Sequence, residues 1–256
     1  MSNEEEIKKY RVDDLGVKVF STRQMMGQAA ARDVAERIRK LLSTKDRVSI
    51  IFAAAPSQDE FLAALSEEKN IDWSKITALH LDEYIGLDTD ASQRFSKYLD
   101  QHIFDIVKPG KVHYIVENDI ADEDILKRYK KILKDNPPDI ACIGIGENGH
   151  IAFNDPPVAD FDDQELIKIV ELDNKCRRQQ VHDGCFDNIE KVPELAYTLT
   201  IPAIMAADFI SCVVPGPTKT EAVKHTLNGD ITEDCPASIL RKHKDAVLYL
   251  DRKASA

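Results

Sequence analysis

Hydrophobic and polar positions follow two periods along the chain, one typical of helices and one of buried strands. Residues 25–42 place apolar side chains three or four positions apart, which predicts an amphipathic helix that Thr22 is positioned to cap. The run VSIIFAA at 48–54 is short, apolar and partly β-branched, which predicts a buried parallel strand. Ser57 and Glu60 then have the spacing of a capping box and predict a helix that continues to about residue 65.

The same alternation of strands and helices continues along most of the chain. Further strands are predicted at 76–81, 112–115, 139–145, 166–172, 197–201, 209–214 and 246–250. Further helices are predicted at 92–104, 122–133, 175–181 and 218–227. Strands that alternate with helices imply right-handed crossovers between parallel strands. We therefore expect an α/β three-layer sandwich, with a mostly parallel Rossmann-like sheet and helices on both faces, as a single domain over residues 1–256.

Residues 151–164 interrupt this rhythm, because they contain two adjacent prolines and four aspartates without a useful period. A loop of this length within a compact domain is typically a binding or lid segment. In parallel α/β sheets the ligand lies beyond the carboxyl ends of the strands. We therefore expect the polar residues that follow Phe52, Leu81, Ile145 and Val214 to face one shared cleft.

Composition and charge narrow the classes of function. With 43% hydrophobic and 31% charged residues among 256, the chain has the composition of a globular protein. A net charge of -11 argues against nucleic-acid and membrane-surface partners, because such partners are bound by a basic face. The first residues carry no apolar run, so neither a secretion signal nor a membrane span is predicted, and a cytoplasmic location is expected. The 5 cysteines lack paired spacings, which predicts reduced thiols rather than disulfides or a zinc site.

Two strand ends carry residues suited to acid–base chemistry. Asp82 and Glu83 follow the strand predicted at 76–81, and His150 lies on the glycine-rich turn after the strand at 139–145. Asn148 and Asp155 are near enough in sequence to fix the tautomer of the histidine. A carboxylate and an imidazole in one cleft suit proton abstraction beside a carbonyl, with protonation of an oxygen and without a metal. For each of these residues a purely structural role is the alternative.

The turn GIGENG at 144–149 has the spacing of a dinucleotide-binding motif. That motif needs a long helix directly after it, and here Pro156 and Pro157 come too early. We therefore interpret Gly146 and Gly149 as parts of a tight turn where the backbone approaches a ligand closely. No nicotinamide cofactor is expected.

Four segments resemble the glucosamine-6-phosphate deaminase/isomerase family: LDEYIGL at 81–87, GIGENGHIAFNDP at 144–156, VPGPTK at 214–219 and PASIL at 236–240. The likeness runs from about residue 19 to residue 251, and the related 6-phosphogluconolactonases typically have Arg in place of Tyr84. The resemblance implies a deaminase-like hydrolase/isomerase that needs no cofactor and no metal. It implies that His150, Asn148 and Asp155 assist opening of the sugar ring, and that Asp82 moves a proton between C2 and C1 before ammonia is lost.

The resemblance also implies a small sugar phosphate as the partner of this chain. The residues expected to bind it are Ser57, Gln58, Glu83, Gly146, Gly149, Arg178 and Lys219. Among them, Lys219 matches the phosphate-binding lysine of the family. The segment AAAPSQ at 53–58 stands where the family usually has a Gly-Gly-Ser/Thr phosphate loop, and its proline removes an amide donor.

Three functions therefore stay open. The first is conversion of glucosamine 6-phosphate, or a close relative, to fructose 6-phosphate and ammonia. The second is a 6-phosphogluconolactonase-type hydrolase or another sugar-phosphate isomerase, which the altered loop motivates. The third is a catalytically weak sugar-binding sensor, because Asn148 and Asp155 stand where many family members have Asp and Glu. The sequence leaves the oligomeric state open, a homo-oligomer included.

Overall fold

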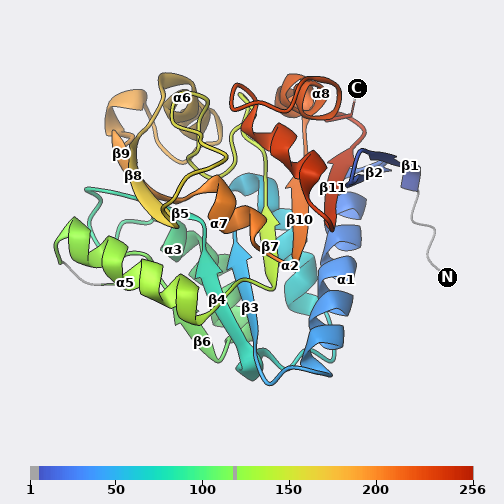
Figure 1. Ribbon diagram of the computed structural model, residues 1–256, viewed down its shortest axis with the longest axis horizontal. Coiled ribbons are helices and arrows are strands. Elements are labelled where there is room, and N and C mark those ends of the chain that lie inside the picture. The colour runs from blue at the N-terminus through green and yellow to red at the C-terminus, as the bar shows by residue number, and fades with distance from the viewer. Residues whose placement is uncertain (1–5, 118–119, 256) are drawn as a thin grey trace.

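The structure, a computed structural model, describes residues 6–117 and 120–255. Within these residues, eight strands form one sheet in the order β1-β2-β11-β10-β7-β3-β4-β6 (Figure 1). Their bounds are β1 (Glu6–Val12), β2 (Leu15–Phe20), β3 (Val48–Phe52), β4 (Ile76–His80), β6 (Lys111–His113), β7 (Ile140–Ile143), β10 (Phe209–Val214) and β11 (Ala246–Asp251). Every neighbouring pair from β2 to β6 is parallel, and β1 pairs with β2 in antiparallel orientation. The predicted mostly parallel sheet is confirmed.

A smaller antiparallel sheet stands beyond the carboxyl end of β4. It has the order β5-β9-β8, with β5 (Asp82–Tyr84), β9 (Leu195–Leu199) and β8 (Ile167–Glu171). Because β5 begins just after β4 ends, the chain passes from one sheet to the other at Leu81. Asp82 is paired with Thr198 of β9, which fixes its backbone at this junction.

Helices cover both faces of the large sheet. Their bounds are α1 (Arg23–Leu42), α2 (Asp59–Glu67), α3 (Phe95–Leu99), α4 (Asp105–Val107), α5 (Asp122–Asp135), α6 (Asn174–His182), α7 (Ile201–Met205) and α8 (Thr220–Asn228). A π-helical turn (Asp100–Phe104) joins α3 to α4, and 3-10 turns span Pro56–Gln58, Trp73–Lys75, Ile189–Lys191, Pro217–Lys219 and Pro236–Lys242. Among the described residues, no helix has both the length and the apolar character needed to cross a bilayer.

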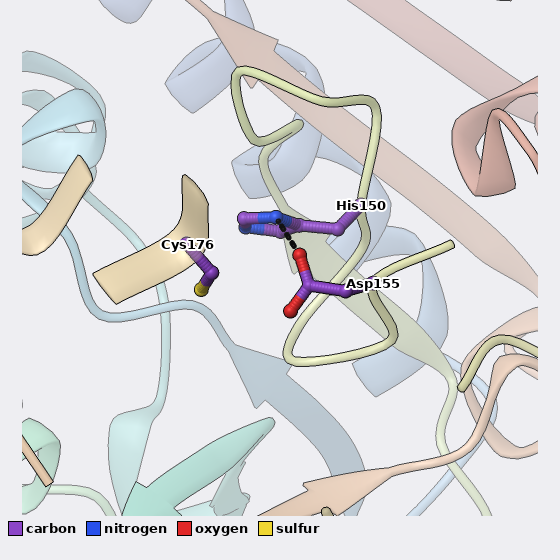
Figure 2. A group of neighbouring side chains, drawn as sticks. All are labelled: His150, Asp155 and Cys176. Atoms are coloured by element: carbon purple, nitrogen blue, oxygen red, sulfur yellow. Dashed lines mark ion pairs between the residues drawn. The ribbon is translucent and has the colours of Figure 1, made fainter. Parts of the chain in front are cut away.

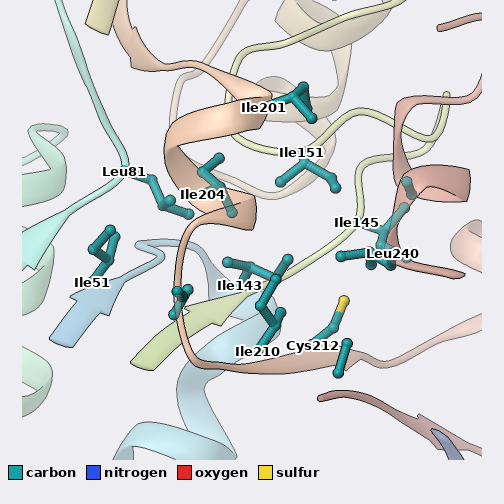
Figure 3. Close-up of a cluster of buried hydrophobic side chains, with 14 of the residues drawn as sticks. Ile51, Leu81, Ile143, Ile145, Ile151, Ile201, Ile204, Ile210, Cys212 and Leu240 are labelled. Carbon is teal, nitrogen blue, oxygen red and sulfur yellow. The ribbon is translucent and has the colours of Figure 1, made fainter. Parts of the chain in front are cut away.

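Two buried apolar clusters lie on opposite faces of the sheet, since successive side chains of a strand point to opposite sides. Ile50 and Phe52 of β3 belong to the cluster that includes α1, α2 and α3. Ile51, between them, belongs to the cluster that includes α5, α7 and α8, part of which is drawn in Figure 3. The predicted three-layer sandwich is therefore confirmed.

Most predicted elements are found within two residues of their expected ends. The cap at Thr22 is confirmed, because its Oγ1 accepts a hydrogen bond from Met25 N at 3.2 Å. The capping box is wrong: Ser57 lies in a 3-10 turn and accepts from the Gln58 side chain, while Glu60 pairs with Arg23. The proline at position 56 favours this separate turn, so that α2 begins only at Asp59.

Three further elements differ from the prediction. The helix expected at 92–104 is α3 followed by the π-helical turn, and it begins only at Phe95. The strand expected to end at Ile201 ends at Leu199, because Thr200 Oγ1 accepts from Ala203 N and starts α7. The hairpin β1–β2 was not predicted, since its edge strand is charged and β2 is ordered by pairing with the distant β11.

Candidate active site

A pocket opens at the carboxyl ends of β3, β4, β7 and β10. The expectation that the residues after these four strands face one cleft is confirmed. Of the residues predicted for the site, the pocket wall brings together Ser57, Gln58, Asp82, Gly146, His150 and Lys219.

The turn after β7 holds the imidazole of His150 against Gly146. Gly146 N donates to His150 O at 3.0 Å, and Gly149 N donates to Gly146 O at 3.1 Å. A Cβ on Gly146 would lie 2.1 Å from His150 Cε1 and 2.2 Å from Nε2, so the ring occupies the space of a side chain. Gly149 has a φ of +87°, a conformation that favours glycine. The two glycines are thus required for different reasons, one by the ring and one by the backbone.

Asn148 and Asp155 both contact the Nδ1 side of His150. Nδ1 lies 2.7 Å from Asn148 Oδ1 and 2.9 Å from Asp155 Oδ1 (Figure 2), and Asn148 Nδ2 donates to Asp155 Oδ1 at 2.8 Å. Because both neighbours of Nδ1 are acceptors, we assign the ring hydrogen to Nδ1. Nε2 is then the basic nitrogen of a side chain that lines the pocket.

Asp155 is ionised beside the imidazole although only 1% of it is exposed. Burial on its own raises the pKa of Asp155, but the His150 ring, with polar contacts from Asn148 and Cys176, lowers that pKa overall. One carboxylate oxygen, Oδ2, has no hydrogen-bond partner in the described part of the chain. The aspartate therefore reaches the imidazole despite being one methylene shorter than glutamate, and it keeps one oxygen unused.

The side chain of Asp82 lines the pocket, while its backbone carbonyl is hydrogen-bonded to the ring of His80. Burial raises the pKa of this carboxyl well above its usual range, and the negative charge of Glu83 raises it further. Burial lowers the pKa of His80 to about 3, so the His80 ring is neutral. His80 Nε2 accepts from Ile115 N at 2.9 Å, and its Nδ1 donates to Asp82 O at 2.8 Å. A carboxyl with a raised pKa is suited to take up and return a proton near neutral pH.

The side chain of Glu83 bonds to the protein backbone and does not line the pocket. Its side chain is fully buried, and its carboxylate accepts from the backbone amides of Tyr84, Phe95 and Ser96 at 3.0–3.1 Å. Two of these amides belong to the first turn of α3, which lacks a capping side chain of its own. Glu83 thus caps α3 from a neighbouring strand, in contrast to its expected contact with substrate.

Lys219 supplies the positive charge of the pocket wall. Its side chain is 5% exposed, and burial lowers its pKa although the carboxylates of Asp183 and Glu147 partly offset this. No hydrogen bond or ion pair of its ammonium group is found with any residue that the structure describes. A buried, unpaired ammonium group is costly to keep. It is therefore suited to receive an anionic group of a ligand.

The altered segment 53–58 lines the pocket beside this lysine. Gln58 is 1% exposed, and its Nε2 donates to Val213 O and to Ser57 Oγ, both at 3.2 Å. Its Oε1 has no partner in the described residues, so the amide can accept a hydrogen bond from a ligand. The loop thus offers side-chain amide and hydroxyl groups instead of a glycine backbone.

Helix α6 contributes residues that sequence reasoning missed. Gln179 and Gln180 are buried and line the pocket. Gln180 Oε1 accepts from the Tyr84 hydroxyl at 2.8 Å, which leaves its amide hydrogens as donors. Arg178 is exposed and lines a neighbouring cleft, so the structure does not bring it to the pocket. The sequence signal that could have indicated Gln179 and Gln180 is that both are polar and lie on the buried face of the helix predicted at 175–181.

Comparison with known proteins agrees with this geometry. A family profile described as glucosamine-6-phosphate isomerases/6-phosphogluconolactonase matches residues 21–249. A glucosamine-6-phosphate deaminase of Streptococcus suis is 36% identical over 235 residues, which are 91% of this chain and 95% of that protein. One of Bacillus cereus is 32% identical over 218 residues, which are 85% of this chain and 80% of that protein.

Solved structures show the same fold. A monomeric glucosamine-6-phosphate deaminase superposes with a TM-score of 0.85 at 30% identity, covering 93% of this chain and 98% of that chain. A 6-phosphogluconolactonase from Thermotoga maritima superposes with a TM-score of 0.75 at 19% identity, covering 93% of this chain and 100% of that chain. This similarity shows a shared fold alone. The names of the deaminases do not support the hydrolase part of the sequence-based expectation. The chain belongs to the family of glucosamine-6-phosphate isomerases and 6-phosphogluconolactonases.

Proposed function

We propose that this enzyme isomerises and deaminates an amino-sugar phosphate, converting glucosamine 6-phosphate, or a close relative, into fructose 6-phosphate and ammonia. The observation that carries the proposal is the shared pocket, which Asp82 and His150 line from two different strand ends. The deaminase names of relatives at 32–36% identity support the same activity.

Opening of the sugar ring is assigned to His150. Its Nε2 accepts the proton of the anomeric hydroxyl and returns a proton to the ring oxygen, which leaves an open-chain aldehyde. While the ring is protonated, the carboxylate of Asp155 stabilises the positive charge through Nδ1 at 2.9 Å. Asn148 holds the same nitrogen and the carboxylate, so that the imidazole keeps one orientation.

The isomerisation is assigned to Asp82. Its carboxylate removes the proton from C2 while the ammonium group of the substrate gives a proton to the aldehyde oxygen, which leaves an enolamine. The same carboxyl then delivers its proton to C1, and C2 becomes a ketose imine. Water adds to that imine and ammonia leaves, so no proton is gained or lost by Asp82 over the cycle. The raised pKa of Asp82 makes it a stronger base for the first of these steps.

Lys219 is assigned to the anionic end of the substrate. Among the described residues, Lys219 is the lysine or arginine on the pocket wall, whereas Arg178 lines a separate cleft. A phosphate at this position restores the charge balance of a buried ammonium group. Gln58 and Gln180 are placed to hydrogen-bond sugar hydroxyls or phosphate oxygens on the same wall.

The test is to incubate the purified protein with glucosamine 6-phosphate and to measure ammonia and fructose 6-phosphate together. Equal amounts of the two products are expected, and Asp82→Asn is expected to abolish both. Asp90→Asn is the matched control, because Asp90 is exposed and lies outside the pocket wall. Absence of both products with the wild type, or undiminished turnover in Asp82→Asn, would contradict the proposal.

A second candidate is isomerisation of another sugar phosphate without deamination. The alanines and proline at 53–56 favour it, because they change how the pocket holds the phosphate end. A panel of hexosamines, hexoses and lactones, each with and without a 6-phosphate, separates the two candidates. Turnover confined to amino sugars excludes the second one.

A further inference from the structure

Three different kinds of metal ligand converge behind the imidazole of His150. A ring nitrogen of His150, a carboxylate oxygen of Asp155 and Cys176 Sγ all lie within 4.8 Å of one another, and all three residues are buried. Figure 2 shows that their side chains point toward one another, the thiol from α6 and the other two from the segment after β7. In the described residues this is the one group of its kind.

We propose that this cluster is an inhibitory binding site for a divalent cation of the zinc type. Zn²⁺ takes imidazole nitrogen, thiolate sulfur and carboxylate oxygen in tetrahedral geometry, at about 2.0–2.3 Å. Hard cations such as Mg²⁺ and Ca²⁺ prefer all-oxygen sites, so they do not suit this set. Three protein ligands leave the fourth position to a water molecule.

The unused oxygen of Asp155 is an independent sign of a missing ligand. Asp155 Oδ2 belongs to a side chain that is 1% exposed, and it lacks a hydrogen bond of normal geometry among the described residues, although the Cys176 thiol acts on the same carboxylate as a polar neighbour. A buried charged oxygen without a partner is costly. The other oxygen already lies 2.9 Å from His150 Nδ1, so a cation needs the two groups to separate only slightly.

A second cleft gives a route to the thiol from outside. It is lined by Cys176 and Asn148, with Glu147 and His182 also on its wall. Lys175 and Arg178 lie on the same cleft and repel a cation, but both are exposed and are therefore screened by solvent. Inside, burial and then the carboxylates of Asp155 and Asp82 raise the pKa of the Cys176 thiol, so a cation has to displace the thiol proton in order to bind.

Metal binding releases the proton of Sγ to solvent, while the imidazole stays neutral and keeps its one proton on the nitrogen that the metal leaves free. His150 then cannot form the imidazolium needed for ring opening, and Asp155 is occupied by the metal. This inhibitory consequence depends on the proposed function, whereas metal binding does not. Because protons compete with the cation, we expect binding to weaken as the pH falls.

Binding is tested with Co²⁺ as a spectroscopic probe on the full chain after removal of metals by a chelator. One equivalent of Co²⁺ is expected to give a thiolate-to-cobalt charge-transfer band, and Zn²⁺ is expected to remove it by displacement. The band should be absent in Cys176→Ser and retained in Cys185→Ser, which changes a half-buried thiol outside the cluster. Cys176→Ala is the second variant, and thermal unfolding shows which variants are folded.

Inhibition is tested by ammonia release in increasing Zn²⁺, with each variant referred to its own metal-free rate. Loss of the thiolate ligand is expected to raise the inhibitory Zn²⁺ concentration by about 10- to 100-fold or more. No band with the wild type, or an equal band in folded Cys176 variants, overturns the site. A band without inhibition of an active enzyme overturns the inhibitory role. A wild type without deaminase activity counts against the proposed function and leaves the cobalt result unaffected.

Discussion

Replacing Gly146 by alanine tests most directly the placement of the His150 imidazole, to which we assign ring opening. The added methyl group would lie 2.1 Å from His150 Cε1, 2.2 Å from Nε2 and 2.4 Å from Nδ1. Ordinary carbon contacts need about 3.5–4.0 Å, so the ring has to move by about 1 Å or more. The backbone itself tolerates the change, because Gly146 is not among the residues with positive φ.

This displacement breaks the contacts that orient the ring. His150 Nδ1 now lies 2.7 Å from Asn148 Oδ1 and 2.9 Å from Asp155 Oδ1, and a shift of this size carries at least one of them beyond hydrogen-bond distance. A misplacement of about 1 Å at a catalytic group costs about 100-fold in rate. We therefore expect kcat for ammonia release to fall about 100-fold, with overpacking costing about 1–3 kcal/mol in the free energy of unfolding.

The assay compares initial rates of ammonia release with thermal unfolding of the same preparations. Gly16→Ala is the control, because a Cβ there meets its neighbours at 3.5 and 3.6 Å, which is ordinary contact. It is expected to keep the wild-type rate. A folded Gly146→Ala enzyme whose kcat stays within about threefold of the wild type would refute the reasoning, since a ring displaced by 1 Å cannot sustain that rate.

Three other predictions follow from the same geometry. Asp82→Asn is expected to lower kcat by about 100- to 10,000-fold. The folded-state pKa of Asp82 is raised, so the contribution of its protonated carboxyl to stability is lost as the pH rises. The Asp82→Asn variant should therefore gain stability relative to the wild type with increasing pH, by about 1.4 kcal/mol per unit of difference between the folded and unfolded pKa. Denaturant unfolding at several pH values measures this gain. Lys219→Ala is expected to raise KM for a phosphorylated substrate by about 10- to 100-fold through loss of a charged hydrogen bond. Lys224→Ala, at an exposed position of α8, the helix that begins directly after Lys219, should leave KM unchanged. Glu83→Ala leaves backbone amides of α3 without acceptors and should lower the free energy of unfolding by about 1–3 kcal/mol; an unchanged melting temperature with a raised KM would instead assign Glu83 to the substrate.

The strand ends were predictable from the sequence because their signals are local. Hydrophobic runs mark β3, β4, β7 and β10, and the polar residues after them fall at one edge of a parallel sheet by geometry alone. Asp82 and His150 were placed in one pocket by this rule. The same rule did not place Gln179 and Gln180 in the pocket, because they lie on a helix, and the role of a buried polar residue there is known only once its neighbours in space are known.

Glu83 shows the limit of the same reasoning. In sequence it is the second of two adjacent carboxylates, and nothing in the local pattern separates it from Asp82. In the structure the alternation of β5 sends the two side chains to opposite sides, one to the pocket and one to the amides of α3. The partner that decides the role of Glu83 lies twelve residues away and is found only by folding.

The sequence by itself determined the order of the elements, the parallel sheet and the edge at which chemistry is located, because hydrophobic period and strand-end position are properties of short segments. Only the tertiary structure decided which polar residues meet there. The burial of Lys219, and the approach of Cys176 to His150 and Asp155, join segments that local periodicity treats separately. Hydrogen bonds and burial act over a few ångströms in space, whatever the separation along the chain.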